Sequence, residues 1–491
     1  MPLTARTRHV VLPAAVLLTV CGLAPVAERS QLQDAALRAG TMQSTTPMSV
    51  ARAAHTASVL AGNRVLIVGG FTADEDAAQG AEIYDAGTRR YTALPRMITL
   101  RHSHTATVMP DGKVLIVGGY ARGSTTLASA ELFDPSTSSF TATDSLNSAR
   151  AGHVAVRLSD GNVLVAGGIG PNWTFLASAE LYSAATGTFV PTGAMIVARE
   201  SHTASHLQDG RVLIFGGHRG RRADITLYAS AETYDASTGR FTRAGDMLTR
   251  RHKHDAVLLR DGRVLVTGGA DERDSGGTYN TTELFDPGSG TFSAGPSMQR
   301  SRYKHNGSAT LLQDGTVLIA GGAVQAEIFD PLRRSFTLVG GDARMAGLFS
   351  AVAPLSAGRV LVTGGYGDRG GPRASSWVYR PAAGIELSPR WLRRHIACRA
   401  ALNSRDLCDR STGSRAHHTD RSTLTHAAHD RTHGARQRPM HHFARFGPLS
   451  GNSGTATESS VFRSQVNDAR NVTGRSALAL AETTCTLFGA S

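Results

Sequence analysis

The chain has 491 residues, of which 53 are glycine and only 19% are charged, a composition that favours many short strands over long helices. The formal net charge is +13, but the segment from Arg390 onward holds 15 arginines, no lysine and 7 acidic residues, and two more arginines lie near the N-terminus. Roughly +3 remains for the central region, which argues against a nucleic-acid-binding surface there.

Residues 1–27 have the pattern of a secretory signal peptide. A basic head precedes the apolar run VLPAAVLLTVCGLA, and small residues then lead to Ala27. The apolar run is short and is interrupted by Pro13, so it predicts a cleaved signal rather than a membrane-spanning helix. We therefore expect a secreted or periplasmic protein with a linker over residues 28–40 and no transmembrane segment.

A lipid anchor at Cys21 is the second interpretation of the same segment. Val20 precedes this cysteine, where a small residue would be expected in a lipoprotein. The next cysteine is Cys398, so the region between them is predicted to fold without disulfides.

A segment that contains a glycine pair recurs seven times along the chain. Successive pairs are 49, 49, 49, 52, 53 and 43 residues apart. The pairs begin at Gly69, Gly118, Gly167, Gly216, Gly268, Gly321 and Gly364. Each unit reads approximately R-x-x-H-T-A-x-x-L-x-D-G-R-V-L-I-x-G-G, followed by a variable loop and A-E-L-Y-D-P-x-T-G-x-F. A constant period of this length predicts one structural unit repeated around a ring or along a solenoid.

Each unit predicts four antiparallel strands. Asp-Gly pairs such as Asp111-Gly112 separate two apolar runs, as in a hairpin whose turn needs a positive φ. A third strand carries Glu-x-Tyr/Phe-Asp, and a second turn leads to a fourth strand that begins at an aromatic residue. We therefore predict an all-β fold, a seven-bladed β-propeller over residues 41–390.

The closing strand of the ring is predicted from residue spacing. Met42, Met48 and Arg52 repeat the spacing of the segment between the fourth strand of one unit and the next unit. This favours residues 41–48 as the outer strand of the last blade. The alternative uses residues 384–388.

The unit resembles the kelch repeat, and the resemblance covers residues 41 to about 388. The region also resembles the kelch domain of copper radical oxidases such as galactose oxidase, whose units carry Arg-x-x-His followed by a Leu-x-Asp-Gly hairpin. That family binds copper with two Tyr and two His, one Tyr being thioether-linked to a Cys. Here the repeats have no cysteine, and Tyr303 is one residue out of place in Arg302-Tyr303-Lys304-His305. We therefore expect no copper-radical site, no catalytic residues, no metal site and no cofactor.

One face of the propeller is predicted to bind ligand. Because strand direction alternates, the variable loops and the Arg-x-x-His segments emerge on the same face, which we call the loop face. Its aromatic residues can stack against sugar rings or pack between loops, and its basic residues suit carboxylates. The candidate ligand-binding residues are His102, Tyr120, Trp173, Arg221, His252, Lys253, Tyr279, Tyr303 and Lys304.

The Arg-x-x-His segments themselves are interpreted as structural. Six near-identical positions around a ring do not make one catalytic centre, because a catalytic site needs different groups at one point. We expect them to hold blades together, for instance through the third-strand glutamates; the alternative is a basic collar for an acidic sugar. The residues are Arg52, His55, Arg101, His104, Arg150, His153, Arg199, His202, Arg251, His254, Arg302 and His305.

The remaining segment, residues 391–491, is rich in Arg, His, Thr and Ala and shows neither strand nor helix periodicity. We predict that it is disordered. A second hypothesis is that it represents an out-of-frame reading of the gene.

Taken together, the sequence favours a monomeric extracellular propeller that binds a glycan or an extracellular protein ligand without catalysis. The alternative is a carbohydrate-active enzyme, either a galactose oxidase-like oxidoreductase with an altered site or a sugar isomerase or mutarotase that uses the Arg-x-x-His residues.

Overall fold

The computed structural model describes residues 39–73, 80–221, 224–342, 347–367 and 370–382. The expected signal peptide (1–27), most of the linker and the tail (391–491) lie outside the described residues. Within the described part of the chain, no helix is long and apolar enough to cross a membrane.

The strands are short and are grouped into seven sheets that follow the sequence repeats. Blades one to three are β2 (Thr56–Leu60), β3 (Arg64–Val68), β4 (Ala81–Asp85) and β5 (Arg90–Ala93); β6 (Thr105–Val108), β7 (Val114–Val117), β8 (Ala130–Asp134) and β9 (Ser139–Ala142); β10 (Val154–Arg157), β11 (Val163–Ala166), β12 (Ala179–Tyr182) and β13 (Phe189–Pro191). Blades four to six are β14 (Thr203–His206), β15 (Val212–Phe215), β18 (Ala231–Asp235) and β19 (Arg240–Ala244); β20 (Asp255–Leu258), β21 (Val264–Thr267), β22 (Thr282–Asp286) and β23 (Thr291–Ala294); β24 (Ala309–Leu311), β25 (Val317–Ile319), β26 (Glu327–Asp330) and β27 (Ser335–Leu338). Blade seven contains β29 (Ala351–Pro354), β30 (Val360–Thr363) and β31 (Ser376–Arg380).

Short elements decorate the loops. They are a two-stranded ribbon of β16 (His218–Arg219) and β17 (Thr226–Leu227), and the 3-10 turns η1 (Arg122–Ser124), η2 (Pro171–Trp173), η4 (Asp274–Gly276) and η5 (Ser356–Gly358).

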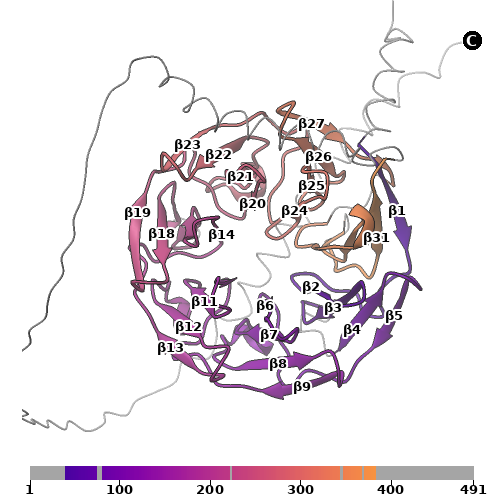
Figure 1. Ribbon diagram of the computed structural model, residues 1–491, viewed down its shortest axis with the longest axis horizontal. Helices are drawn as coiled ribbons and strands as arrows, with labels where there is room; N and C mark the ends of the chain where they lie inside the picture. Colours follow the sequence, from indigo (N-terminus) through magenta and orange to yellow (C-terminus); the bar gives the residue numbers. More distant parts are fainter. Residues whose placement is uncertain (1–38, 74–79, 222–223, 343–346, 368–369, 383–491) are drawn as a thin grey trace, which may run out of the picture. The chain divides into compact units, whose positions relative to one another are not determined.

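The innermost strands of neighbouring blades contact one another in a closed circle. The circle runs from β2 through β6, β10, β14, β20, β24 and β29 and back to β2 (Figure 1). Within each blade the strands pair antiparallel, and in blades one to six their order in the sheet is their order along the chain. The fold is therefore an all-β seven-bladed propeller, as predicted.

The ring is closed by a strand from the start of the domain. β1 (Thr41–Thr45) pairs antiparallel with β31, with Thr41 opposite Arg380 and Thr45 opposite Ser376. It also pairs in parallel with the two-residue strand β28 (Gly340–Gly341) at the outer edge of the sheet. Residues 384–388, the other candidate for this position, lie outside the described residues.

Apolar side chains fill the seven seams between blades. Each hydrophobic cluster combines residues of two neighbouring blades. In β3, for example, Val65 and Ile67 pack with blade seven whereas Leu66 and Val68 pack with blade two. The second strand of a blade is buried on both faces, which is why its sequence is a continuous apolar run rather than an alternating one.

The hairpins opposite the loop face use the Asp-Gly pairs as predicted. In blade two Gly112 has φ 84°, and the carboxylate of Asp111 accepts a hydrogen bond from the backbone N–H of Lys113. Glycine adopts a positive φ at little energetic cost, and the hydrogen bond to the Asp carboxylate stabilises the turn.

Blade six departs from the repeat because two additional residues follow His305. The carboxylate of Asp255 in blade five is fully buried there and accepts hydrogen bonds from the backbone N–H groups of Ser308 and Ala309 at 2.8 Å. Blades one to four and seven have Thr, Val or Ala at this position of the first strand. Asp255 therefore joins the irregular segment of blade six to its neighbour.

Candidate functional site

The arginines of the Arg-x-x-His segments are fully buried, and each pairs with the third-strand glutamate of its own blade. The Nη2 to Oε1 distance is 2.8 or 2.9 Å in all six pairs. The pairs are Arg52–Glu82, Arg101–Glu131, Arg150–Glu180, Arg199–Glu232, Arg251–Glu283 and Arg302–Glu327. Burial lowers the pKa of each arginine, and its glutamate opposes that shift. These charges are neutralised inside the blades and are not presented to a ligand.

The histidines of the same segments lie between blades. His104 Nε2, for example, is hydrogen bonded to Thr56 Oγ1 of the preceding blade at 3.1 Å. Its ring also packs on the first glycine of that blade, since a Cβ at Gly69 would lie 2.5 Å from His104 Cε1. Burial lowers the pKa of His55, His202 and His305 to about 3, with the neighbouring arginine adding to the shift. The histidine side chains are therefore neutral and fill the space between neighbouring blades. We call the six ion pairs and six histidines together the frame.

A ring of residues in left-handed backbone conformation surrounds the propeller axis on the loop face. Each blade contributes the residue before its histidine or, in blade seven, the equivalent residue, with φ between 52° and 62°. The members are Ala54, Ser103, Gly152, Ser201, Lys253, Lys304 and Phe349. In six of the seven, the N–H donates to the carbonyl oxygen of the member in the preceding blade. These blade-to-blade hydrogen bonds offset the steric cost of a left-handed conformation at residues other than glycine. We call this feature the left-handed ring.

Two further variable positions in most blades face each other beside this ring. The residue after the arginine and the residue after the glycine pair form a backbone bridge. The bridged pairs are Ala53–Phe71, His102–Tyr120, Ala151–Ile169, Glu200–His218, His252–Ala270 and, in the arginine-free blade seven, Leu348–Tyr366. These positions, the left-handed ring, Tyr303 after the arginine of blade six, and the adjoining loop residues Trp173, Arg221 and Asp274 together form what we call the mouth. Its side chains differ from blade to blade although the backbone repeats.

Charged and titratable groups gather on blades four to six of the mouth. His218 Nε2 lies 3.1 Å from Glu200 Oε2, and His218 Nδ1 lies 3.2 Å from His252 Nδ1. Lys253 Nζ donates to both oxygens of Asp274 at 2.8 and 2.9 Å. Lys304 Nζ lies 3.9 Å from Asp274 Oδ2. The residues of this group are Glu200, His218, His252, Lys253, Asp274 and Lys304. We call these six residues the charged half of the mouth.

Burial and the two ammonium groups together set the ionisation of the charged half. Burial alone would raise the pKa of Asp274, but Lys253 and Lys304 outweigh it and hold this pKa well below its usual range. Burial lowers the pKa of His252 and His218, and Lys253 adds to both shifts. The carboxylate of Asp274 is therefore ionised and both histidines are neutral at neutral pH.

Aromatic side chains line the mouth on the remaining blades. The centres of successive rings are 5.4 to 6.2 Å apart. In order around the mouth the rings are Phe349, Tyr366, Phe71, His102, Tyr120 and Trp173. The series ends where the Arg221 guanidinium carbon lies 3.5 Å from the centre of the Trp173 ring. We call these six residues the aromatic half. Arg221 marks its border with the charged half.

The structure brings most of the predicted ligand-binding residues to the mouth. The members are His102, Tyr120, Trp173, Arg221, His252, Lys253, Tyr303 and Lys304, although His102, His252, Tyr303 and Lys304 are buried. Tyr279 lies elsewhere: its ring covers the buried Arg251 guanidinium at 5.3 Å, as Tyr228 covers Arg199 at 5.4 Å. Sequence reasoning missed Glu200, His218 and Asp274, of which Glu200 and His218 occupy the two variable positions of blade four.

Comparisons with known proteins agree with this architecture. A family model described as the KLHDC2/KLHL20/DRC7 Kelch-repeats domain matches residues 104–322. Among solved structures, a fungal alcohol oxidase of the AA5 family in complex with copper is similar, with a TM-score of 0.56 and 16% sequence identity; the match covers 70% of this chain and 76% of the oxidase chain. No curated protein sequence matches significantly.

The residues present do not fit the copper site expected of a galactose oxidase-like protein. His305 is fully buried and its Nε2 is hydrogen bonded to Thr267 of blade five, so it is directed into a seam. In the described ranges, no three His, Cys, Asp or Glu side chains are grouped so that they could hold a metal ion. What the chain shares with that oxidase is its fold, and with its seven repeats this protein is a kelch-repeat β-propeller.

Proposed function

We propose that this protein is a secreted or periplasmic glycan-binding propeller that acts as a monomer. The glycan lies at the mouth on the loop face, with a sugar ring against Trp173 and Tyr120. No catalytic step is part of this proposal.

The observation that carries the proposal is the presentation of Trp173. This residue is at the tip of its loop with φ 59°, and Asn172 before it has φ 54°. Bulky residues adopt this conformation rarely, and strained backbone of this kind is concentrated at ligand sites. The Trp173 side chain is partly exposed and lies beside Tyr120, with ring centres 6.2 Å apart. Two adjacent aromatic rings at a surface suit the apolar face of a pyranose.

Trp173 lies at the border between the aromatic half and the charged half, and the cations beside it favour an acidic sugar. Arg221 lies on one side of the indole ring, and the charged half of the mouth follows in blades four to six. A guanidinium binds carboxylate oxygens in a bidentate manner, and the partly exposed Lys253 supplies a second cation. A glycan that contains a uronic acid combines both requirements.

The proposal is tested by measuring glycan binding to the full chain with a glycan array and by calorimetry on the best ligand. Trp173→Ala and Arg221→Ala are each expected to weaken binding by about tenfold, a change of about 1.4 kcal/mol. Arg219→Ala is the matched control, because Arg219 is an exposed arginine of the same loop. Its affinity should equal that of the wild type.

Two results would contradict the proposal. One is binding that Trp173→Ala leaves unchanged. The other is a protein ligand that engages the loop face while no glycan binds. The enzymatic alternative is less well supported, because an isomerase that uses the Arg-x-x-His residues needs accessible acid and base groups and these side chains are buried.

A further inference from the structure

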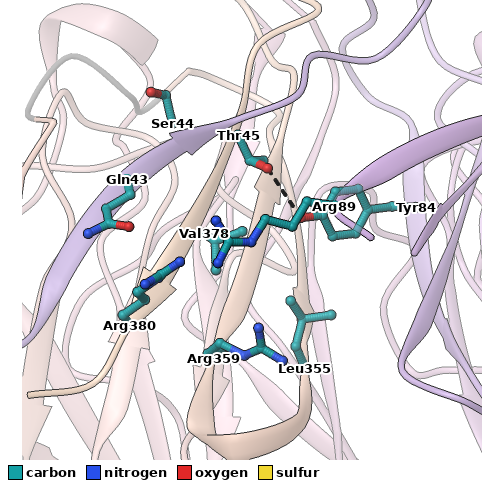
Figure 2. Close-up of a pocket in the computed structure, with 9 residues that line it drawn as sticks. All are labelled: Gln43, Ser44, Thr45, Tyr84, Arg89, Leu355, Arg359, Val378 and Arg380. Atoms are coloured by element: carbon teal, nitrogen blue, oxygen red, sulfur yellow. Dashed lines mark hydrogen bonds between the residues drawn. The ribbon is translucent and has the colours of Figure 1, made fainter. Parts of the chain in front are cut away.

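A second site lies at the seam where the ring closes, on the face that carries the Asp-Gly hairpins. Figure 2 shows a pocket between β1, blade seven and blade one. It is a small depression that is open to solvent. The hydroxyl groups of Thr45 and Tyr84 are hydrogen bonded across it at 3.3 Å, so the pocket spans the closing strand and the first blade.

Three arginines from three different elements line this pocket. Arg89 comes from the turn between β4 and β5, Arg359 immediately precedes β30, and Arg380 ends β31 (Figure 2). The other polar lining groups are the neutral side chains of Gln43, Ser44, Thr45 and Tyr84, and no carboxylate lines the pocket. Among the described residues, no Asp or Glu forms an ion pair with any of the three arginines.

Arg359 has lost the partner that equivalent residues have. In blades four and five the hairpin arginine pairs with the Asp two residues before it, with distances of 2.6 Å for both Arg211–Asp209 and Arg263–Asp261. In blade seven Ala357 occupies the position of that Asp. Arg359 instead donates to the carbonyl oxygen and hydroxyl of Ser356, which leaves its charge uncompensated.

Arg89 is held in an unfavourable backbone conformation. Its φ is 57°, whereas blades three to five place glycine at the same position of the turn. The carboxylate of Asp85, in the same turn, accepts hydrogen bonds from the backbone N–H groups of Gly87 and Thr88 and forms no ion pair with the Arg89 side chain. The Nε of Arg380 is buried without a hydrogen-bond partner. Like charges around one pocket repel each other, so an anion in the pocket would stabilise this arrangement.

We propose that this pocket binds a tetrahedral oxyanion, a phosphate or sulfate group. Arginine recognises such groups through pairs of N–H donors, and proteins commonly bind them with clusters of arginines. The group is either a free inorganic ion or part of a phosphorylated or sulfated sugar. Because the pocket joins β1 to blades seven and one, the bound anion would also fasten the closing strand. This inference does not rest on the proposed glycan site, which lies on the other face.

The test is a titration of the full chain with inorganic phosphate, inorganic sulfate and a sugar 6-phosphate, each compared with chloride at equal ionic strength. Calorimetry reports the affinity, and hydrogen exchange of the Thr41–Thr45 amides reports the closing strand. Saturable binding of one phosphate or sulfate with slower exchange in β1 is expected. Stronger binding of the sugar phosphate than of the free ions would identify the esterified form as the ligand.

Two matched pairs of variants assign the effect to the pocket. Arg89→Gly removes the side chain and is compatible with φ 57°, so it should fold and should lose about tenfold or more in affinity. Arg334→Gly is its control, because Arg334 is exposed and has φ 50° at the same turn position of blade six. Arg359→Gln should weaken binding similarly, and Arg263→Gln should not. Equal responses to chloride and phosphate, or binding that survives Arg89→Gly, would overturn the proposal.

Discussion

The frame and the mouth use neighbouring residues of the same segment in opposite ways. In Arg-x-x-His the first and fourth residues are repeated six times, buried and bound within or between blades. The second and third residues differ from blade to blade and contribute to the mouth. One backbone geometry therefore supports both stability and variability, because the ion pairs of the frame form within each blade without the side chains of the mouth. The difference predicts where substitutions are costly.

The largest expected effect is acid unfolding through the frame histidines. All six have pKa values lowered from 6.5 by burial, so the unfolded chain binds more protons below pH 6.5. Their contribution to stability is present above pH 6.5 and is lost as the pH falls toward 3. Each histidine lowers the free energy of unfolding by about 1.4 kcal/mol per pH unit in that window, so six lower it by about 8 kcal/mol per pH unit, an amount comparable to the whole stability of a typical domain.

Urea unfolding as a function of pH measures this effect. Below pH 6.5, the slope of the free energy of unfolding against pH should correspond to the uptake of several protons on unfolding. Asp255 has the opposite effect on the pH dependence. Burial raises its pKa to about 6, so the folded state binds its proton more tightly than the unfolded state does, and this one group offsets part of the effect of the histidines. A free energy of unfolding that is constant between pH 6.5 and about pH 5 would contradict the assignment of neutral, buried histidines.

Breaking one ion pair of the frame should have the next largest effect. Glu180→Gln leaves the Arg150 cation buried, and it weakens hydrogen bonds that Glu180 accepts from Asn147 and Ser148. We expect a loss of about 3–5 kcal/mol in the free energy of unfolding, measured with urea. Asp209→Asn is the control: it breaks an ion pair of similar length whose side chains are 41% and 42% exposed, and it should cost less than about 1 kcal/mol. Equal losses would remove the distinction between buried and exposed pairs.

The glycine pairs separate conformational cost from crowding. A Cβ at Gly118 would lie 2.5 Å from the carbonyl oxygen of Arg150 and 2.9 Å from His153 Cε1. At Gly112, which also has positive φ, no atom lies within 4 Å of that position. Gly118→Ala should therefore reduce the midpoint temperature more than Gly112→Ala, by an amount equivalent to about 2 kcal/mol or more. Similar midpoints for the two variants would show that the frame relaxes around the added methyl group.

The smallest expected effect lies in the left-handed ring. Ala54 has φ 52°, and Ala54→Gly removes the steric cost of that conformation while keeping the N–H that donates to Phe349. Thermal unfolding should show unchanged stability or a gain of up to about 1 kcal/mol, since the greater freedom of glycine in the unfolded chain offsets part of the relief. A loss larger than about 1 kcal/mol would mean that the side chains of the ring are as constrained as the frame.

The sequence predicted the blades well because their signals are local and repeated. Glycine pairs, Asp-Gly turns and the aromatic at or next to the first residue of the fourth strand are each determined by backbone within one unit. The mouth was predicted less completely. Tyr120 directly follows the glycine pair of its unit and lies in the mouth, whereas Tyr279 lies farther along the variable loop of blade five and covers Arg251. The repeat pattern does not encode how the variable loops fold, and the loop conformation decides which of their side chains reach the mouth.

The sequence by itself determined the number of blades, the strands of each unit and the segments that face each side, because all of these follow from a short period of turns and apolar runs. Only the tertiary structure decided which side chains meet. The left-handed ring could not be predicted from the sequence, since six of its seven members are not glycine. The arginine pocket joins residues 89, 359 and 380, which come together because the ring closes on itself. Contacts of that kind depend on closure, and closure is a property of the whole propeller.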